Sequence, residues 1–162
     1  MSNYLFSVKA VKYGTPTGLA TLPDLTTLPD TVKGSVSIDE TEGSVTKFFV
    51  DQKKEPIKVL KTEEGELTAT LQFYDMSYAT LAAFKGGHGA GVTGYTPSTG
   101  YTLIEKALEI ELDSGHKVNI FNAQCVSRIT GGGGRDKMLA LEIKATPQLT
   151  ADSLGSWTIT PV

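Results

Sequence analysis

The sequence contains few of the residues from which disulfide, metal and nucleic-acid sites are usually built. Its 162 residues include one cysteine, two histidines and one tryptophan. A single cysteine cannot form an internal disulfide, so we expect folding in a reducing cytoplasm. The 15 lysine and arginine residues are outnumbered by 18 acidic residues, which gives a net charge of −3. A nucleic-acid-binding surface would therefore need local clustering of basic residues.

Strong basic clusters and long apolar runs are missing as well. The most basic stretch, residues 52–64, interleaves lysines with glutamates and is typical of a solvated strand and turn. No segment approaches the roughly 20 apolar residues that a membrane-spanning helix requires, so we expect no membrane partner. The start of the chain, MSNYLFSVKAVKYG, lacks a basic beginning and a small-residue cleavage site, so we expect no secretory signal.

The common catalytic and cofactor motifs are also absent. Neither Gly-Lys-Ser nor Gly-Lys-Thr occurs, which excludes a P-loop, and no GxSxG elbow is present. His88 and His116 are far apart and lack cysteine partners at zinc spacing. Cys125 lies in an apolar setting and is predicted to be a buried structural thiol rather than a nucleophile. We therefore expect no catalytic, metal or cofactor site, and no enzyme.

One glycine pattern resembles a dinucleotide fingerprint in spacing alone. Gly89, Gly91 and Gly94 form a GxGxxG sequence. In the nucleotide-binding motif a strand enters and a helix follows, so that the free amides of the helix hold the pyrophosphate. Here a helix is expected before the glycines and Tyr95–Ser98 follows them. This reversed context predicts a flexible loop.

Two acidic patterns favour structural roles over ligand binding. Asp39–Gly43 has oxygen ligands out of register for a calcium loop and indicates an acidic hairpin tip. Glu105, Glu109 and Glu111 alternate with aliphatic residues in the manner of a solvated strand face. These glutamates could supply paired carboxylates for glycoside hydrolysis, but their alternation favours a solvated face. The lining of a polar channel would show the same alternation.

The most informative pattern that is present runs from Glu66 to Gly87, ELTATLQFYDMSYATLAAFKGG. Its first half has the period of two that a half-buried antiparallel strand shows. The residues predicted to face the core are Leu67, Ala69, Leu71 and Phe73.

The second half of this stretch changes to a helical period. Asp75 is predicted to cap the first turn, and Gly86 to end the helix in a left-handed conformation. The predicted apolar stripe of the helix consists of Tyr78, Leu81, Ala82 and Phe84.

The rest of the chain is dominated by short strand patterns separated by turn residues. In the first, Tyr4, Phe6, Val8 and Ala10 are expected to share a face. In the strand expected over residues 138–146, the inward residues would be Leu139, Leu141, Ile143 and Ala145. The other predicted strands cover residues 32–39, 44–51, 56–61, 103–112, 116–122, 124–130 and 156–160. Residues 103–112 also have a composition that favours helix.

These patterns predict a mainly β protein, a β-sandwich or barrel of about eight strands with one flanking short α-helix. We expect residues 1–162 to form a single domain, with an irregular loop over residues 14–31 and a glycine-rich loop over residues 86–100. The sequence TLPD occurs at Thr21–Asp24 and again at Thr27–Asp30. Its prolines exclude a central strand, and its leucines need apolar cover, so we expect a clamp over this domain or over a neighbouring subunit.

The chain resembles the tail tube, or major tail, proteins of long-tailed bacteriophages, which are related to the tube proteins of contractile and type VI secretion systems. The resemblance lies in the strand ending at Phe73-Tyr74-Asp75, followed by Ser77-Tyr78 and an Ala/Leu-rich helix that Gly86-Gly87 ends. It extends to residues 116–129 and to residues 137–146, where Ala145-Thr146-Pro147 is similar to the close of such domains.

This resemblance implies a structural subunit of the virion tail, synthesised in the host cytoplasm. Six copies would close into a ring by pairing sheet edges, and rings would stack into a tube. DNA would pass through the lumen without sequence-specific binding. The implied partners are further copies of the chain, the tape measure protein and the tail terminator protein.

Two alternatives stay open from the sequence. One is the tube protein of a type VI or contractile secretion system. The other is a carbohydrate-binding β-sandwich module, which would need exposed aromatic residues on one face. Trp157 is the only tryptophan, and its place near the end of the chain favours a packing role.

Overall fold

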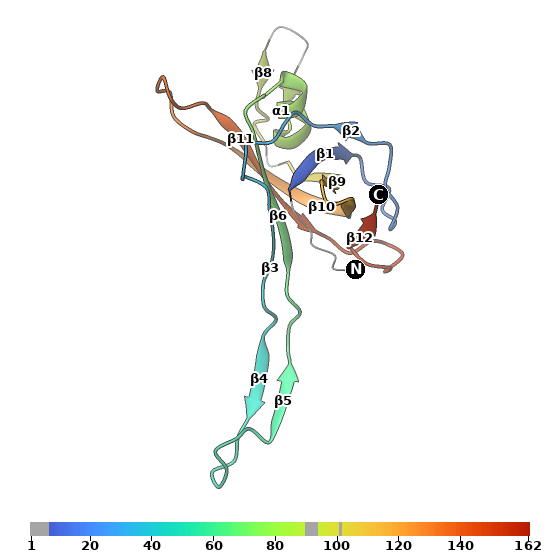
Figure 1. The fold of residues 1–162 in the computed structure, drawn as a ribbon, viewed down its shortest axis with the longest axis vertical. Helices are drawn as coiled ribbons and strands as arrows, with labels where there is room; N and C mark the ends of the chain where they lie inside the picture. Colours follow the sequence, from blue (N-terminus) through green and yellow to red (C-terminus); the bar gives the residue numbers. More distant parts are fainter. Residues whose placement is uncertain (1–6, 90–93, 101) are drawn as a thin grey trace.

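The structure, a computed structural model, describes residues 7–89, 94–100 and 102–162 (Figure 1). Tyr4, Phe6 and Gly91 of the sequence predictions lie outside these ranges. In chain order the elements are β1 Val8–Gly14, β2 Thr26–Thr27, β3 Ser37–Glu40, β4 Val45–Phe48, β5 Lys58–Lys61, β6 Leu67–Phe73, α1 Tyr78–Lys85, β7 His88–Gly89, β8 Tyr95–Thr96, β9 Ile104–Leu112, β10 His116–Thr130, β11 Ala140–Pro147 and β12 Trp157–Pro161.

The fold is mainly β, with one large sheet and one short helix, as the sequence predicts. Eight strands form the sheet in the order β2-β1-β9-β10-β11-β6-β3, with β12 paired to β10, and all neighbours are antiparallel. Residues 103–112 are therefore strand rather than helix. No helix of the described residues is long and apolar enough to cross a membrane.

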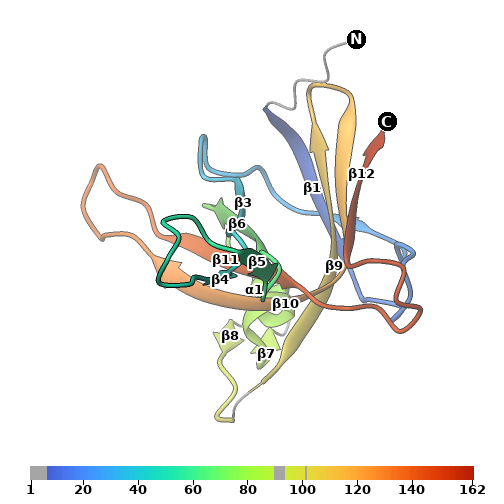
Figure 2. The same cartoon turned by 90° about the horizontal axis from the view of Figure 1, so that it is seen from below.

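The sheet bends strongly along β10, which is 15 residues long (Figure 2). Two predicted strands, residues 116–122 and 124–130, are in fact this one strand. Its first part pairs with β12 and its second part with β11, and the register against β9 shifts between Ile120 and Ala123. Such an irregularity increases local bend and twist. The bend lets one continuous sheet surround a core.

The predicted inward face of β6 is confirmed. Leu67 is 8% exposed, and the three other predicted residues are fully buried. They pack with alternate residues of the neighbouring strands in one core cluster. The largest fully buried side chains of that cluster are Phe73, Phe84, Leu71, Leu108, Ile110, Ile120, Leu141 and Ile143.

The helix begins and faces the core somewhat differently from the prediction. Ser77 is the N-cap, because its hydroxyl accepts a hydrogen bond from the Thr80 amide at 3.2 Å; the assignment of Asp75 was wrong. Ser77 also has the extended backbone that this position requires. Tyr78 is exposed, whereas Leu81 and Phe84 are buried. Tyr78 is therefore not part of the apolar stripe by which α1 packs on the core.

The C-terminal end of α1 is fixed to the sheet. Gly86 has φ +71° and its amide donates to the Ala82 carbonyl, so the helix stops where predicted, but its ψ of −172° differs from the left-handed helical conformation that was expected. The Phe84 ring centroid lies 5.0 Å from that of Tyr13 on β1. The Phe84 carbonyl accepts a 2.7 Å hydrogen bond from Ser127 on β10. The helix thus covers one end of the core and contacts both sides of the bend.

Two inward faces were predicted with the wrong members. In β1 the register shifts between Val8 and Ala10, so two residues of β1 oppose one residue of β9. This shift places Val11 rather than Ala10 in the core, at 2% exposed. In β11 the inward row begins at Leu141, and Leu139, before the strand, is 49% exposed.

The predicted turn between residues 39 and 44 is also wrong. β3 pairs with β6, and β4 pairs with β5, so the chain continues outward where a tight hairpin was expected. Residues 39–66 form a long two-stranded projection, hereafter the arm (Figure 1). The acidic segment Asp39–Gly43 lies where the arm leaves the body rather than at a hairpin tip.

The two predicted loops fold back on their own domain. In the irregular segment 14–31, Leu28 is 5% exposed and its amide donates to the Val11 carbonyl at 2.8 Å. In the glycine-rich segment 86–100, β7 pairs with β8, and the Tyr95 hydroxyl donates to the Gly86 carbonyl at 2.8 Å. The first segment is therefore a clamp over its own body, and the second holds a short pair of strands against α1.

We expect the Phe84→Ala variant to lower the free energy of unfolding by about 3–5 kcal/mol, because it removes a large buried ring and leaves a cavity. The control is Tyr78→Ala on the same helix, where the side chain is 42% exposed. This variant should lower the free energy of unfolding by no more than about 0.5 kcal/mol. Urea unfolding followed by circular dichroism measures both. Equal losses would show that α1 does not depend on its buried face.

Candidate assembly surface

The arm leaves the body as a continuation of β3 and β6. Within it, β4 and β5 are antiparallel, with Val45 opposite Lys61 and Phe48 opposite Lys58. We call residues 39–44 and 62–66 the neck, and residues 45–61 the distal arm. Figure 1 shows the distal arm standing well away from the sheet. An isolated two-stranded ribbon is marginally stable in water, so a partner would stabilise it.

The two chains of the neck are joined by hydrogen bonds between Thr41 and Glu66 and between Ser44 and both Thr62 and Glu63, and by close backbone contacts at two glycines. The Thr41 amide donates to the Glu66 carbonyl at 3.0 Å, and the Glu66 amide donates to the Thr41 hydroxyl at 2.9 Å. A Cβ on Gly65 would lie 1.9 Å from the Thr41 carbonyl oxygen, and a Cβ on Gly43 would lie 2.3 Å from that of Glu63. Glycine is therefore required at both positions for the two chains to approach this closely.

The distal arm exposes apolar side chains to an unusual degree. All eight residues of β4 and β5 are exposed. Phe49 and Ile57, on the connection between them, are 58% and 57% exposed. Contiguous apolar surface of this kind is typical of an interaction site. The exposed apolar residues are Val45, Phe48, Phe49, Val50, Ile57, Val59 and Leu60.

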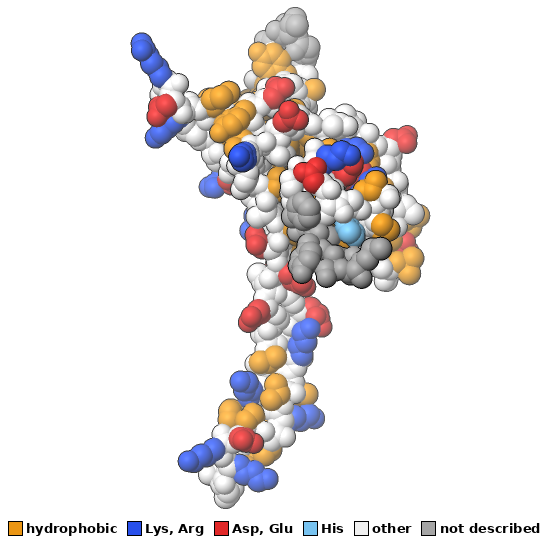
Figure 3. All heavy atoms as spheres, in the orientation of Figure 1, with side chains coloured by type: hydrophobic (Ala, Val, Ile, Leu, Met, Phe, Trp, Pro, Cys, Tyr) orange, Lys and Arg blue, Asp and Glu red, His pale blue; other side chains and the backbone are white. Residues whose placement is uncertain are grey.

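Charge is segregated along the arm. The distal arm has five lysines against Asp51 and Glu55, a net charge of +3. The neck has six acidic residues and neither lysine nor arginine, a net charge of −6. Figure 3 shows basic and hydrophobic side chains gathered over the far part of the arm, with acidic ones nearer the body. The arm therefore presents a basic, apolar end on an acidic base.

The body carries a second apolar surface, a groove of about 350 Å³. It lies beside the β9–β10 turn and the start of β3 and β6. Its lining includes Trp157, which is half-buried and packs against the core, and Ile159, which is 44% exposed. The full lining is Ser7, Val8, Val36, Ile38, Leu67, Leu112, Val118, Trp157 and Ile159.

Two of the three predicted carboxylates of β9, Glu109 and Glu111, are paired with lysines, whereas Glu105 is exposed, as a solvated face predicts. Glu109 is 7% exposed and lies 3.0 Å from Lys12 on β1 and 3.6 Å from Lys117 on β10. Glu111 lies 2.7 Å from Lys9, and the hydrogen bond from that ammonium lowers the pKa of Glu111. The expectation of a solvated face was therefore wrong for Glu109. We call this face of β1, β9 and β10 the paired outer face. Its net charge is small because the lysines of β1 and β10 flank the glutamates of β9.

The remaining candidate residues are not brought together. His88 lies in β7 and His116 begins β10, near opposite ends of the body (Figure 2). The described ranges hold no group of three or more His, Cys, Asp or Glu residues that could bind a metal ion. Gly89 follows α1 and Gly94 precedes β8, so the order of elements is the reverse of a dinucleotide-binding turn, as predicted.

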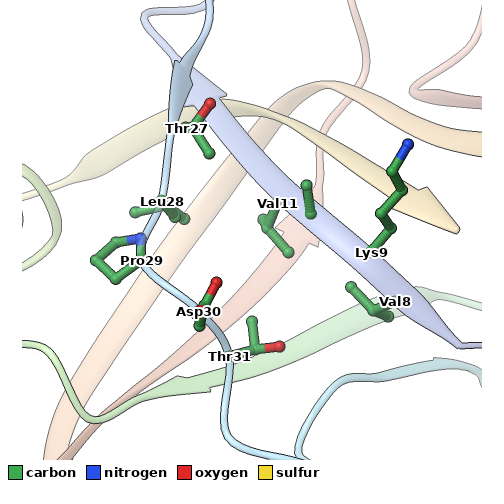
Figure 4. Close-up of a pocket in the computed structure, with 9 residues that line it drawn as sticks. Val8, Lys9, Val11, Thr27, Leu28, Pro29, Asp30 and Thr31 are labelled. Atoms are coloured by element: carbon green, nitrogen blue, oxygen red, sulfur yellow. The ribbon is translucent and has the colours of Figure 1, made fainter.

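A further hollow of about 220 Å³ lies between β1 and residues 27–31. Figure 4 shows the Leu28 and Val11 side chains lying between these two segments, with Lys9 extending away. Lys9 is engaged with Glu111, so the hollow lacks a convergent set of reactive groups. It is the seam along which the clamp segment packs on β1.

Comparison with known proteins finds no matching family model and no matching curated protein.

Cys125 is predicted to be unreactive in the folded protein. It is 5% exposed, as expected from the sequence, and burial raises its pKa to about 12. At pH 8 the thiolate fraction should be about a thousandfold below that of an ordinary thiol. An aromatic disulfide reagent should label Cys125 only after unfolding. The control is Met138→Cys, at a position 64% exposed, which should react at once. Equal rates at the two thiols would contradict the buried assignment.

Stability is predicted to fall in acid, below the ordinary glutamate value of 4.5. Hydrogen bonds from Lys9, Arg128 and Thr150 lower the pKa values of Glu111, Glu142 and Asp152 respectively. A carboxylate with a lowered pKa stabilises the fold above its unfolded pKa, and this contribution is lost as pH falls through the folded pKa.

The Asp152→Asn variant tests one of these carboxylates. Asp152 accepts hydrogen bonds from Thr150, from Leu154 and from the Ala20 amide at 2.9 Å. We expect a loss of stability at pH 7 and a weaker dependence on pH below 3.8, the ordinary pKa of an aspartate. Urea unfolding between pH 3 and 7 measures this, with Asp51→Asn on the arm as control. An unchanged pH profile would show that this carboxylate is not engaged.

Proposed function

We propose that this chain is a structural subunit of a bacteriophage or prophage tail tube, which assembles as hexameric rings that stack into a DNA-conducting tube. It works by self-association rather than by catalysis. Its other partners would be the tape measure and tail terminator proteins. The assembled protein would reside in the virion tail after synthesis in the host cytoplasm.

The exposed distal arm is the observation that carries this proposal. Seven large apolar residues are exposed on a projection that has little core of its own. A monomer that displayed such a surface permanently would be prone to aggregation. In a polymer each copy buries this apolar surface against a neighbour, so the surface forms the contact that joins the subunits.

The sheet also supports lateral association. It is open, because its order runs from β2 to β3 without closure, and β12 lies as a further outer strand on β10. Open edges present unpaired amide and carbonyl groups that can pair with another chain. Cyclic symmetry satisfies such edges in a closed ring. In a ring of copies paired edge to edge, the amide and carbonyl groups of the sheet edges would all be hydrogen-bonded.

The paired outer face of β1, β9 and β10 is suited to the passage of DNA without binding. Affinity for DNA depends on cations that neutralise phosphates. Lys9, Lys12 and Lys117 are already engaged by glutamates at 2.7, 3.0 and 3.6 Å. Few lysines on this face remain to hold phosphate, so a lumen lined by it would let DNA move through.

We expect the purified chain to form rings or tubes with a central hole, visible by negative-stain microscopy and as large species in sedimentation velocity. The double variant Phe48→Asp, Ile57→Asp should abolish stacking, because it places charges in the apolar surface of the distal arm. Its thermal unfolding should change little, since both side chains are exposed.

The matched control is Leu154→Asp, a single exposed apolar residue on a loop of the body, 78% exposed. It should assemble as the wild type does. A wild-type chain that stays monomeric at high concentration would overturn the proposed function. If the double variant still assembles, the distal arm is not the contact that joins the subunits.

A further inference from the structure

The two ends of the core are closed differently. α1 covers the end near Ile104, which pairs with Cys125. At the other end of the same two strands Leu112 pairs with His116, and there the apolar groove is open. The single tryptophan, Trp157, lines this opening. An apolar surface left at one end of a core is a place where another chain can dock.

The groove adjoins the acidic neck of the arm. Val36 and Ile38 line it, and Glu40 continues the same face of β3, since alternate residues of a strand share a face. Asp113 follows the lining residue Leu112 and is exposed. On its other side the groove gives way to a smaller hollow with Lys33 in its lining. The groove therefore has an apolar floor, with Glu40 at its border with the neck and Asp113 at the β9–β10 turn.

The distal arm has the complementary chemistry. It combines exposed Phe48, Phe49 and Ile57 with five lysines. Aromatic and aliphatic side chains fit the floor of the groove, and lysines fit Glu40 and Asp113 beside it. Figure 1 shows the arm extending away from the body, and the groove is lined by residues of the body, so the distal arm that docks there has to come from a different copy.

We propose that the distal arm of one copy docks in the apolar groove of a second copy, with its lysines against Glu40, Asp113 and the neck. This inference rests on the proposed self-assembly and assigns the acceptor surface. The contact is heterologous, because arm and groove are different surfaces, so each copy can donate one arm and accept another. Contacts of this type close into a ring or continue as an open filament, depending on the rotation between copies.

Cysteine pairing between two full-length variants tests the contact. One variant carries Ile57→Cys on the arm, and the other carries Ile159→Cys in the groove. Mixed under mild oxidation, they should yield a disulfide-linked heterodimer. The native Cys125 is 5% exposed and does not compete. The matched control pairs Ile57→Cys with Met138→Cys, which is 64% exposed on the far hairpin and should give about a tenfold lower yield.

Charge exchange tests the pairing of lysines with Glu40 and Asp113 separately. Lys53→Glu with Lys58→Glu in the arm variant should lower the disulfide yield about tenfold, because like charges then meet. Glu40→Lys with Asp113→Lys in the groove variant should do the same. Mixing the two charge-reversed variants should restore the yield. Failure of this restoration, with both chains folded, would overturn the assigned pairing.

The outcomes separate this inference from the proposed function. A wild-type chain that does not self-associate removes the proposed function itself. If the chain assembles but the arm and groove cysteines do not form a disulfide, only the assignment of the groove as acceptor is wrong. Residues 1–6 precede Ser7 in the lining, so a further variant lacks residues 2–6. If Ile159→Cys becomes accessible to a thiol reagent only in that variant, the groove is occupied by its own chain and the inference is overturned.

Discussion

The packing of Phe84 between the helix and the bent sheet is the contact on which the architecture depends. It closes one end of a core that strands from every part of the sheet share, and it links α1 to β1 through Tyr13 and to β10 through Ser127. Within residues 7–89, 94–100 and 102–162, no second helix covers the opposite end. The groove beside Trp157 follows from this asymmetry, as does the division of the molecule into a packed body and an arm with almost no core.

Local periodicity was enough to predict the elements whose burial depends on one strand alone. The alternation in β6 and the glycine stop at Gly86 were both correct, because each reflects a backbone requirement that neighbours do not alter. The cap was assigned to Asp75 instead of Ser77, since both residues are good caps and only the backbone geometry selects between them. The buried Glu109 was missed because its lysine partners lie on two other strands.

Pairing between distant strands was the information that periodicity lacked. The turn residues at 41–43 look the same whether the chain reverses or continues, and only the pairing of β3 with β6 decides between these possibilities. The register shift between Val8 and Ala10 likewise becomes evident only from the pairing of β1 with β9. The exposed distal arm could have been suspected from its sequence, because residues 45–61 combine β-branched and aromatic residues with five lysines and no alternation.

The glycine-pinched neck has a mechanical consequence. Three backbone hydrogen bonds cross the neck, from the Thr41 amide to the Glu66 carbonyl and from the Thr62 and Glu63 amides to the Ser44 carbonyl. Bending there strains fewer backbone bonds than bending in the body, where the strands are paired residue by residue. The neck is thus the compliant joint of the molecule. A filament whose subunits are coupled through such joints would curve by tilting its arms, and each body would keep its shape as the filament flexes.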